Sequence, residues 1–204
     1  MDPPFPSSPA SNPHMTFLIR PYTGLTSRLR NTILNAQFAS RSPCKLRVLV
    51  EGPYGHPLSL QHFSHVLFIV GGSGITVPLA QLSKLAPGNA TVVWAVRQHS
   101  FFEDVYARDL DLQKAAKLHV FVTGDELDKL EGDERESVVF HGGRPHVGAV
   151  ISDAAEGGAL SRGKCAVVVC GPGGMVGEAR AALLTVLEKD EGLDIEFLEE
   201  SFSW

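Results

Sequence analysis

The chain has few cysteines and no long apolar run. Its 204 residues include only Cys44, Cys165 and Cys170, and no two of them form a C-x-x-C pair. We interpret these cysteines as reduced thiols of a cytosolic protein, because a disulfide framework or a zinc site needs paired cysteines. No apolar stretch approaches the roughly 18 residues that span a bilayer, so the sequence predicts no transmembrane helix of its own.

An excess of basic residues is also missing. Lys and Arg total 18 against 23 Asp and Glu, which gives a net charge of −5 and no basic stripe. This balance argues against a nucleic-acid surface. The first 14 residues lack the cationic start and apolar centre of a signal peptide. They are rich in Pro, Ser and Asn, so we expect them to be disordered or to be the edge of a cut domain. The charged run 125–136 is interpreted as a solvated loop.

Two common catalytic patterns are absent as well. The phosphate-loop pattern of NTPases requires Lys followed by Ser or Thr after its last glycine, whereas Ile75 and Thr76 stand there. None of the three tyrosines has a lysine four residues later, which excludes a short-chain dehydrogenase. Neither nucleotide hydrolysis of the phosphate-loop type nor that dehydrogenase chemistry is therefore expected.

What the sequence does contain is a regular alternation of strands and helices after residue 65. We expect strands over residues 66–70, 91–97, 117–124 and 165–170 and near the C-terminus, with helices over 75–85, 101–116, 147–156 and after 172. This rhythm predicts an α/β fold with a doubly wound parallel sheet. Upstream, residues 15–20 and 45–55 are predicted to form strands, and Thr26 or Ser27 to cap a short helix.

A glycine cluster follows the first buried strand, in the stretch "LFIVGGSGITVPLAQL" (Leu67–Leu82). Glycines at the end of a strand that opens onto a helix let backbone N–H groups approach a ligand phosphate without a Cβ in the way. Gly71, Gly72 and Gly74 meet this need, and Thr76 can add a hydroxyl. A bare turn between strand and helix is an equally open interpretation of this cluster alone.

A second turn of the same design occurs in "VVVCGPGG" (Val167–Gly174). The carboxyl ends of parallel strands share one edge of the sheet, where open α/β sheets bind ligands. Both turns are therefore expected at one crevice. Cys170 is the last strand residue before the second turn, and we assign it a positioning role at most, since buried free cysteines are usually packing residues.

Arg97 bears on the choice of nucleotide. The dinucleotide fingerprint places an acid about 20 residues after the glycines to hold a ribose 2′-hydroxyl, but the second strand ends in Arg97. A cation there would pair with a 2′-phosphate, which favours NADPH over NADH. Val77 stands where that fingerprint has Gly or Ala, and a plain surface arginine is the competing interpretation of Arg97.

Four motifs occur together in order: "EGPYG" (Glu51–Gly55), "GGSGIT" (Gly71–Thr76), "CGPGG" (Cys170–Gly174) and "EESFSW" (Glu199–Trp204). In this set the chain resembles the cytosolic dehydrogenase region of fungal ferric-chelate reductases, relatives of the NADPH oxidases in the ferredoxin–NADP reductase superfamily. The resemblance implies an antiparallel FAD-binding barrel, an NADPH-binding α/β domain and a haem-bearing membrane domain. It implies hydride transfer from nicotinamide to FAD, and electron transfer through haem to ferric or cupric chelates.

The resemblance also assigns residues. The NADPH diphosphate would lie along Gly71, Gly72, Ser73, Gly74, Ile75 and Thr76. The 2′-phosphate would meet Arg97, and a "GRP" motif would place Arg144 near the cofactor. The nicotinamide would border Cys170, Gly171 and Pro172, and Gly173 belongs to the same cofactor-binding set. The FAD diphosphate would meet Gly24, Leu25 and Thr26, and Gly52 and Pro53 of "EGPYG" belong to the same cofactor-binding set.

The C-terminal aromatic residues have an implied role of their own. Family members place such a ring over the flavin, where nicotinamide must displace it before hydride transfer. Phe202 is the candidate here and Trp204 competes with it; a ring that only packs on its own domain is the alternative for both. Stacking of this kind is worth about 1 kcal/mol, which makes it reversible.

One departure from the family limits the flavin site. Where family members have an "HPFT" strand, this chain has "DPPFPSSP", with Pro3 and Pro6 in place of the histidine and threonine. Proline lacks an N–H donor and a hydroxyl. We therefore expect residues 1–55 to be a partial barrel remnant that binds FAD poorly, and residues 56–204 to be an NAD(P)H-binding domain, in a truncated piece of a longer membrane reductase.

Three functions remain open from the sequence. The first is the NADPH-dependent electron-transfer module of a ferric or cupric reductase, on the cytosolic side of a membrane. The second is a soluble flavin reductase of the same superfamily, which would need a complete barrel. The third is a catalytically inactive nucleotide-binding module, which would bind NADPH without reducing flavin.

Overall fold

The computed structural model describes residues 17–19, 21, 23–40, 45–51, 58–109, 112, 117–124 and 137–200. The chain divides into two compact units, Met1–Glu51 and Gly52–Trp204, and each is considered by itself. The predicted sites at Gly52, Pro53, Phe202 and Trp204 lie outside the described residues. Nowhere in the described ranges is a helix both long enough and apolar enough to span a bilayer.

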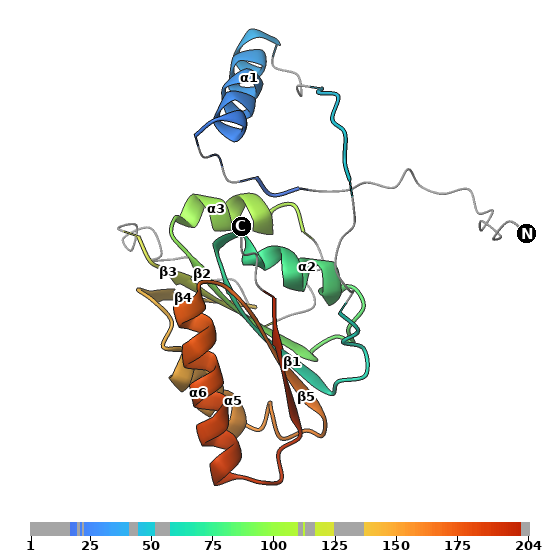
Figure 1. Ribbon diagram of the computed structural model, residues 1–204, viewed down its shortest axis with the longest axis vertical. Coiled ribbons are helices and arrows are strands. Elements are labelled where there is room, and N and C mark those ends of the chain that lie inside the picture. Colours follow the sequence, from blue (N-terminus) through green and yellow to red (C-terminus); the bar gives the residue numbers. More distant parts are fainter. Residues whose placement is uncertain are drawn as a thin grey trace, which may run out of the picture. The chain divides into compact units, whose positions relative to one another are not determined.

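The second unit is built on one parallel sheet (Figure 1). Its six strands are β1 (His65–Gly71), β2 (Ala90–Val96), β3 (Lys117–Val122), β4 (Val138–Gly142), β5 (Cys165–Cys170) and β6 (Ile195–Glu199). They are ordered β4-β3-β2-β1-β5-β6, and every neighbouring pair is parallel. The central strands β1 and β5 are almost wholly buried, as their unbroken apolar runs require.

Helices cover both faces of this sheet (Figure 1). They are the 3₁₀ helix η1 (Gly72–Ile75) and the α-helices α2 (Thr76–Leu82), α3 (His99–Tyr106), α5 (Val147–Glu156) and α6 (Gly173–Lys189). Helices α2 and α3 lie on one face, and α5 and α6 on the other. The doubly wound α/β fold predicted from the alternation of strands and helices is confirmed.

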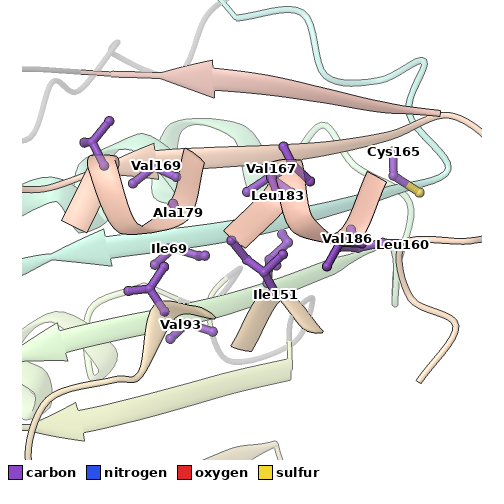
Figure 2. Packing of buried hydrophobic residues seen from close by; sticks show 13 residues of the cluster. Ile69, Val93, Ile151, Leu160, Cys165, Val167, Val169, Ala179, Leu183 and Val186 are labelled. Atoms are coloured by element: carbon purple, nitrogen blue, oxygen red, sulfur yellow. The ribbon is translucent and has the colours of Figure 1, made fainter. Parts of the chain in front are cut away.

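The core between the sheet and the α5–α6 pair is made of small branched residues (Figure 2). Ile69, Val167 and Val169 point from the sheet toward Ile151 of α5 and Leu183 of α6, and all are at most 5% exposed. Side chains on one face of a strand alternate with those on the other, so each strand also supplies the opposite layer. There Trp94 and Phe102 pack with ring centroids 5.9 Å apart. The two layers hold the carboxyl ends of the strands in fixed register.

The strand order changes direction between β1 and β5. From β1 the chain adds β2, β3 and β4 on one side, then crosses back to place β5 and β6 on the other. At such a switch point the two following connections leave on opposite faces of the sheet, which opens a crevice at the strand ends. Both glycine turns follow the strands that meet at this point.

The described part of the first unit contains one helix, α1 (Leu25–Ser40). Gly24 precedes it with φ +86°, a left-handed conformation that favours glycine, and its carbonyl accepts a hydrogen bond from the N–H of Arg28 at 3.1 Å. The predicted helix is present, but it begins at Leu25 and runs for 16 residues. Thr26 and Ser27 therefore lie inside its first turn and do not cap it, and the helix is longer than expected. The strands expected over 15–20 and 45–55 are not: residues 17–19 and 45–51, the described parts of those ranges, belong to no strand.

Two further differences concern the second unit. Strand β4 was not predicted; its sequence, "VVFHG", is short and follows a charged run, and only Val138 of its five residues is buried, as suits an edge strand. The helix expected over 101–116 begins earlier, at His99, and α3 ends at Tyr106. Residues 110, 111 and 113–116 of that expected helix lie outside the described residues.

Candidate functional site

The first turn continues directly from the buried strand β1. Gly72 adopts φ +53°, and residues Gly72–Ile75 form the single turn η1 before α2 begins at Thr76. Two side chains fix this turn through its carbonyl groups: the indole N–H of Trp94 donates to the Gly72 oxygen at 2.9 Å, and the Thr76 hydroxyl donates to the Ser73 oxygen at 3.1 Å. The carbonyls are thereby occupied within the protein, while the first N–H groups of a helix have no intrahelical acceptor.

The second turn follows β5 and leads into the 17-residue helix α6. Pro172 is the N-cap residue, with an extended conformation at ψ 149°, and its carbonyl accepts the N–H of Met175 at 2.8 Å. Gly173 and Gly174 are exposed, and a Cβ built on either would meet no atom within 4 Å. The start of α6 is therefore an open, cap-free helix N-terminus, where the helix dipole favours an anionic group.

The structure brings the two turns into contact. Val70 pairs with Cys170 at the ends of β1 and β5. A Cβ built on Gly71 would lie 3.4 Å from the Pro172 ring and 3.8 Å from the Gly171 Cα. The two turns are therefore in close contact at position 71. The prediction that both turns lie together at one edge of the sheet is confirmed.

Gly74 has a structural reason to be glycine that the sequence did not reveal. A Cβ there would lie 2.6 Å from the Cys170 carbonyl oxygen and 3.0 Å from its sulfur. Gly74 is buried, and backbone of β5 occupies the space that a side chain would need. The absence of a side chain at this position is thus required by the packing of the first turn on the second strand, with or without a ligand.

Cys170 is held as a neutral thiol. It is 3% exposed, and burial, together with the nearby charge of Glu200, raises the pKa of its thiol to about 11. The thiolate is the nucleophilic form, so this cysteine is unreactive near neutral pH. It contributes shape and a weak S–H group to the crevice.

Arg97 and Arg144 follow other strands at the same edge. Arg97 comes directly after β2 and is exposed. Its carbonyl is closely covered by Gly124, where a Cβ would collide with the Arg97 oxygen. Arg144 follows β4 and is also exposed; Gly143 before it adopts φ +81° and donates its N–H to the Val122 oxygen at 2.9 Å. Because β3 lies between β2 and β4, one strand separates the positions of the two arginines.

The remaining predicted positions belong to the first unit. Gly24, Leu25 and Thr26 form the start of α1, and Leu25 is 76% exposed. A shallow depression lies at this helix start, lined by Pro21, Thr23, Ser27 and Arg30. The depression carries hydroxyl groups and one guanidinium, which are donors suited to an anion.

Two residues that position the site were missed from the sequence. Trp94 holds the first turn through its indole N–H, and Gly124 allows the close approach of the strand ends of β2 and β3. A tryptophan inside an otherwise aliphatic buried strand was a usable signal, since a buried indole N–H needs an acceptor. Gly124 gave no signal beyond its place at the end of a strand.

Comparisons with known proteins identify relatives of this chain. Residues 63–184 match the model of the ferric reductase NAD binding domain. The "Ferric/cupric reductase transmembrane component 2" of Saccharomyces cerevisiae is 26% identical over 97% of this chain and 32% of its own length. The "Ferric reductase transmembrane component 6" of the same yeast is 28% identical over 92% of this chain and 29% of its own length.

A plant protein shows the same relationship. The "Ferric reduction oxidase 7, chloroplastic" of Arabidopsis thaliana is 29% identical over 65% of this chain and 21% of its own length. This chain therefore spans about a third or less of each of these relatives. The family match covers both glycine turns, Arg97 and Arg144. The chain belongs to the ferric reductase family and carries its NAD-binding domain.

Proposed function

We propose that this chain is the NADPH-binding electron-transfer module of a ferric or cupric reductase. The observation that carries the proposal is the contact of two glycine turns at the switch point between β1 and β5. One turn leads into η1 and the other into the open N-terminus of α6, so backbone N–H groups from two elements face one edge of the sheet. Such a pair of turns suits a dinucleotide, because one turn can bind the diphosphate and the other can bind the nicotinamide ring.

Each of the two turns would bind a different part of the nucleotide. Residues Gly72–Thr76 would line the diphosphate, and the backbone N–H groups that precede Thr76 would be its donors, because the Thr76 N–H already donates to the Ser73 and Gly74 oxygens. Gly171, Pro172 and Gly173 would border the nicotinamide, and the neutral Cys170 thiol would shape its pocket without reacting. The open space over Gly173 fits this role, because a ring can approach the backbone there without meeting a side chain.

The exposed arginines favour the phosphorylated nucleotide. Arg97 would form charge-assisted hydrogen bonds with the 2′-phosphate of NADPH, a group that NADH lacks. Arg144, one strand further along the edge, would add positive potential near the same group. The chemistry supplied when both cofactors are bound is hydride transfer from NADPH to FAD, followed by release of single electrons.

The flavin side of the proposal draws on residues of both units. Gly24, Leu25 and Thr26 would present the start of α1 to the FAD diphosphate. Gly52 and Pro53, which lie outside the described residues, belong to the same proposed cofactor-binding set. Phe202 would cover the flavin ring, with Trp204 as the competing residue. In a full-length reductase the electrons would then pass through haem to ferric or cupric chelates, with this module on the cytosolic side of the membrane.

The chain alone is proposed to hold FAD weakly. Between residues 17 and 51 the described part contains α1 and no strand, whereas a flavin barrel needs a closed set of strands. This observation also favours the second candidate function, a nucleotide-binding module that binds NADPH without reducing flavin.

One experiment separates the two functions. The purified chain is mixed with FAD and NADPH under anaerobic conditions, and the loss of oxidised-flavin absorbance is followed. The electron-transfer module predicts bleaching that depends on the protein and is enhanced by excess FAD. NADPH binding without any bleaching would leave only the nucleotide-binding module that does not reduce flavin.

A further inference from the structure

Two histidines on the outer strands of the sheet have no part in the proposed function. His119 lies on β3 and His141 on β4, and the register pairs His119 with Val139 and Phe121 with His141. Because Val139 and His141 are two residues apart on one strand, both histidines point to the same face of the sheet. The His119 Nδ1 and His141 Nε2 atoms are 3.2 Å apart.

The pair is held in place yet reachable from solvent. The ring of His141 stacks on Phe121 with centroids 4.4 Å apart and an interplanar angle of 13°, and the two imidazoles are nearly parallel at 23°. Both histidines are half-buried, and Val139 beside them is 47% exposed. Their rings are thus fixed by two paired strands and a stacked phenyl ring, while one side stays open.

The distance between the two nitrogens fits a shared metal ion. A Zn–N bond of about 2.0–2.1 Å places two cis ligands about 2.9 Å apart at a right angle and about 3.3 Å apart at a tetrahedral angle. The observed 3.2 Å lies within this range. We propose that His119 and His141 form a chelating site for a first-row divalent transition ion, Cu²⁺ or Zn²⁺, on the face of β3 and β4.

The protonation states agree with this proposal. Burial lowers the pKa of both imidazoles, and for His119 the neighbouring His141 and Lys117 lower it further. Both rings are therefore neutral at physiological pH, which is the form that binds metals. In the empty pair one of the two facing nitrogens carries a proton. Metal binding requires the tautomer in which that proton lies on the other nitrogen of the same ring, and both ring lone pairs must turn toward the ion.

The ligands of the site also determine how tightly it binds a metal ion and which ion it prefers. Within the described residues no three His, Cys, Asp or Glu side chains converge on one point, so water would complete the coordination. Imidazole ligands favour Cu²⁺ and Zn²⁺ over Mg²⁺ and Ca²⁺, and Cu²⁺ binds most tightly in the usual order. We expect a moderate affinity, because only two protein ligands contribute and Lys117 is close.

The test is a calorimetric titration of the untagged full chain with Zn²⁺, together with electron paramagnetic resonance of the Cu²⁺-loaded protein. The wild type is expected to bind one Zn²⁺ at this site, with affinity that falls on acidification, because protons compete with the ion for the imidazole nitrogens. The Cu²⁺ spectrum is expected to show coupling to two imidazole nitrogens. His119→Gln and His141→Gln should each weaken binding at least roughly tenfold, since each leaves a single ligand.

His62→Gln is the matched control, because His62 is exposed on the same unit and lies outside the pair. It should bind Zn²⁺ like the wild type. Equal affinity in the wild type and both site variants, or a Cu²⁺ spectrum without two nitrogen ligands, would overturn the proposal. The wild-type spectrum decides the matter even if a site variant fails to fold, and circular dichroism identifies such a variant.

Discussion

Gly74 and Gly173 belong to the paired turns, yet a side chain would meet different surroundings at each. At Gly74 it would press on the Cys170 backbone, whereas at Gly173 it would meet open space. Gly74→Ala is therefore expected to lower the free energy of unfolding by about 1–3 kcal/mol, as overpacking does. Gly173→Ala should leave stability unchanged but weaken NADPH roughly tenfold by blocking close approach.

Urea unfolding and NADPH titration of both variants check this pair of expectations. If the Gly173→Ala variant binds NADPH with wild-type affinity, the start of α6 does not contribute to the nucleotide site. A Gly74→Ala variant as stable as the wild type would show that the contact with β5 can relax.

Arg97→Ala tests the choice of nucleotide. Loss of a charge-assisted hydrogen bond of about 1.5–3 kcal/mol should weaken NADPH roughly tenfold to a hundredfold. NADH has no 2′-phosphate and should lose little. Arg162→Ala is the control, because Arg162 is exposed and precedes β5 at the opposite edge of the sheet. Competition titrations with both nucleotides measure the ratio of NADPH to NADH affinity. An equal loss of affinity for NADPH and NADH would show that Arg97 has another role.

At the scale of single residues, the sequence indicated which residues form the two turns better than it indicated why each residue type is needed. The glycines of both turns and the buried, passive Cys170 were recognised in advance. The predicted reason for Gly74 was approach to a diphosphate, whereas the structure shows a contact with β5 that no local pattern encodes. Such a contact joins residues almost a hundred positions apart, so only the register of β1 and β5 reveals it.

Among the elements, β2 supports the first turn through one side chain. Trp94 is fully buried and donates its indole N–H to the Gly72 oxygen. Trp94→Phe keeps an aromatic ring but removes this donor, so we expect a loss of about 1–3 kcal/mol in unfolding free energy and weaker NADPH binding. Denaturation and nucleotide titration measure both effects. Unchanged affinity together with reduced stability would mean that η1 keeps its shape without the indole.

Three histidines of β1, β3 and β4, one buried and two half-buried, predict how stability depends on pH. Burial lowers the pKa values of His65, His119 and His141 below the ordinary 6.5. The unfolded chain then binds more protons than the folded chain as the pH falls below 6.5, so acidification lowers the free energy of unfolding. Their stabilising contribution is complete above 6.5 and is lost as the pH falls through the lowered values.

Urea unfolding at about pH 7.5 and about pH 5.5 measures this dependence. The chain should be less stable at the lower pH, and the double variant His119→Gln, His141→Gln should show a smaller difference. A double variant with the full wild-type difference would assign the effect to other groups.

Strong periodicity decided which elements could be predicted. The buried strands β1 and β5 were clear because both faces are covered and their runs are purely apolar. Strand β4 was missed because an edge strand needs fewer apolar residues, and its partner β3 supplies the pairing. The barrel strands expected before residue 56 followed from the resemblance and local alternation. The described residues 17–19 and 45–51 do not form them.

For the whole molecule, the second unit is a complete doubly wound sheet with its own core, and the family match lies within it. The first unit exposes several large apolar side chains, including Leu49 at 99% and Val48 at 73%. We propose that nucleotide binding depends on the unit with the built core, whereas flavin binding would also need residues of the first unit. We expect the two functions to be separable in experiments.

The central claim is that the paired turns of β1 and β5 bind a reduced nicotinamide nucleotide. The most direct measurement is a calorimetric titration of the folded full chain, verified by circular dichroism, with NADPH and then with NADH. We predict saturable binding of one nucleotide per chain, tighter for NADPH than for NADH. A well-folded chain that shows no saturable binding of either nucleotide would contradict the account.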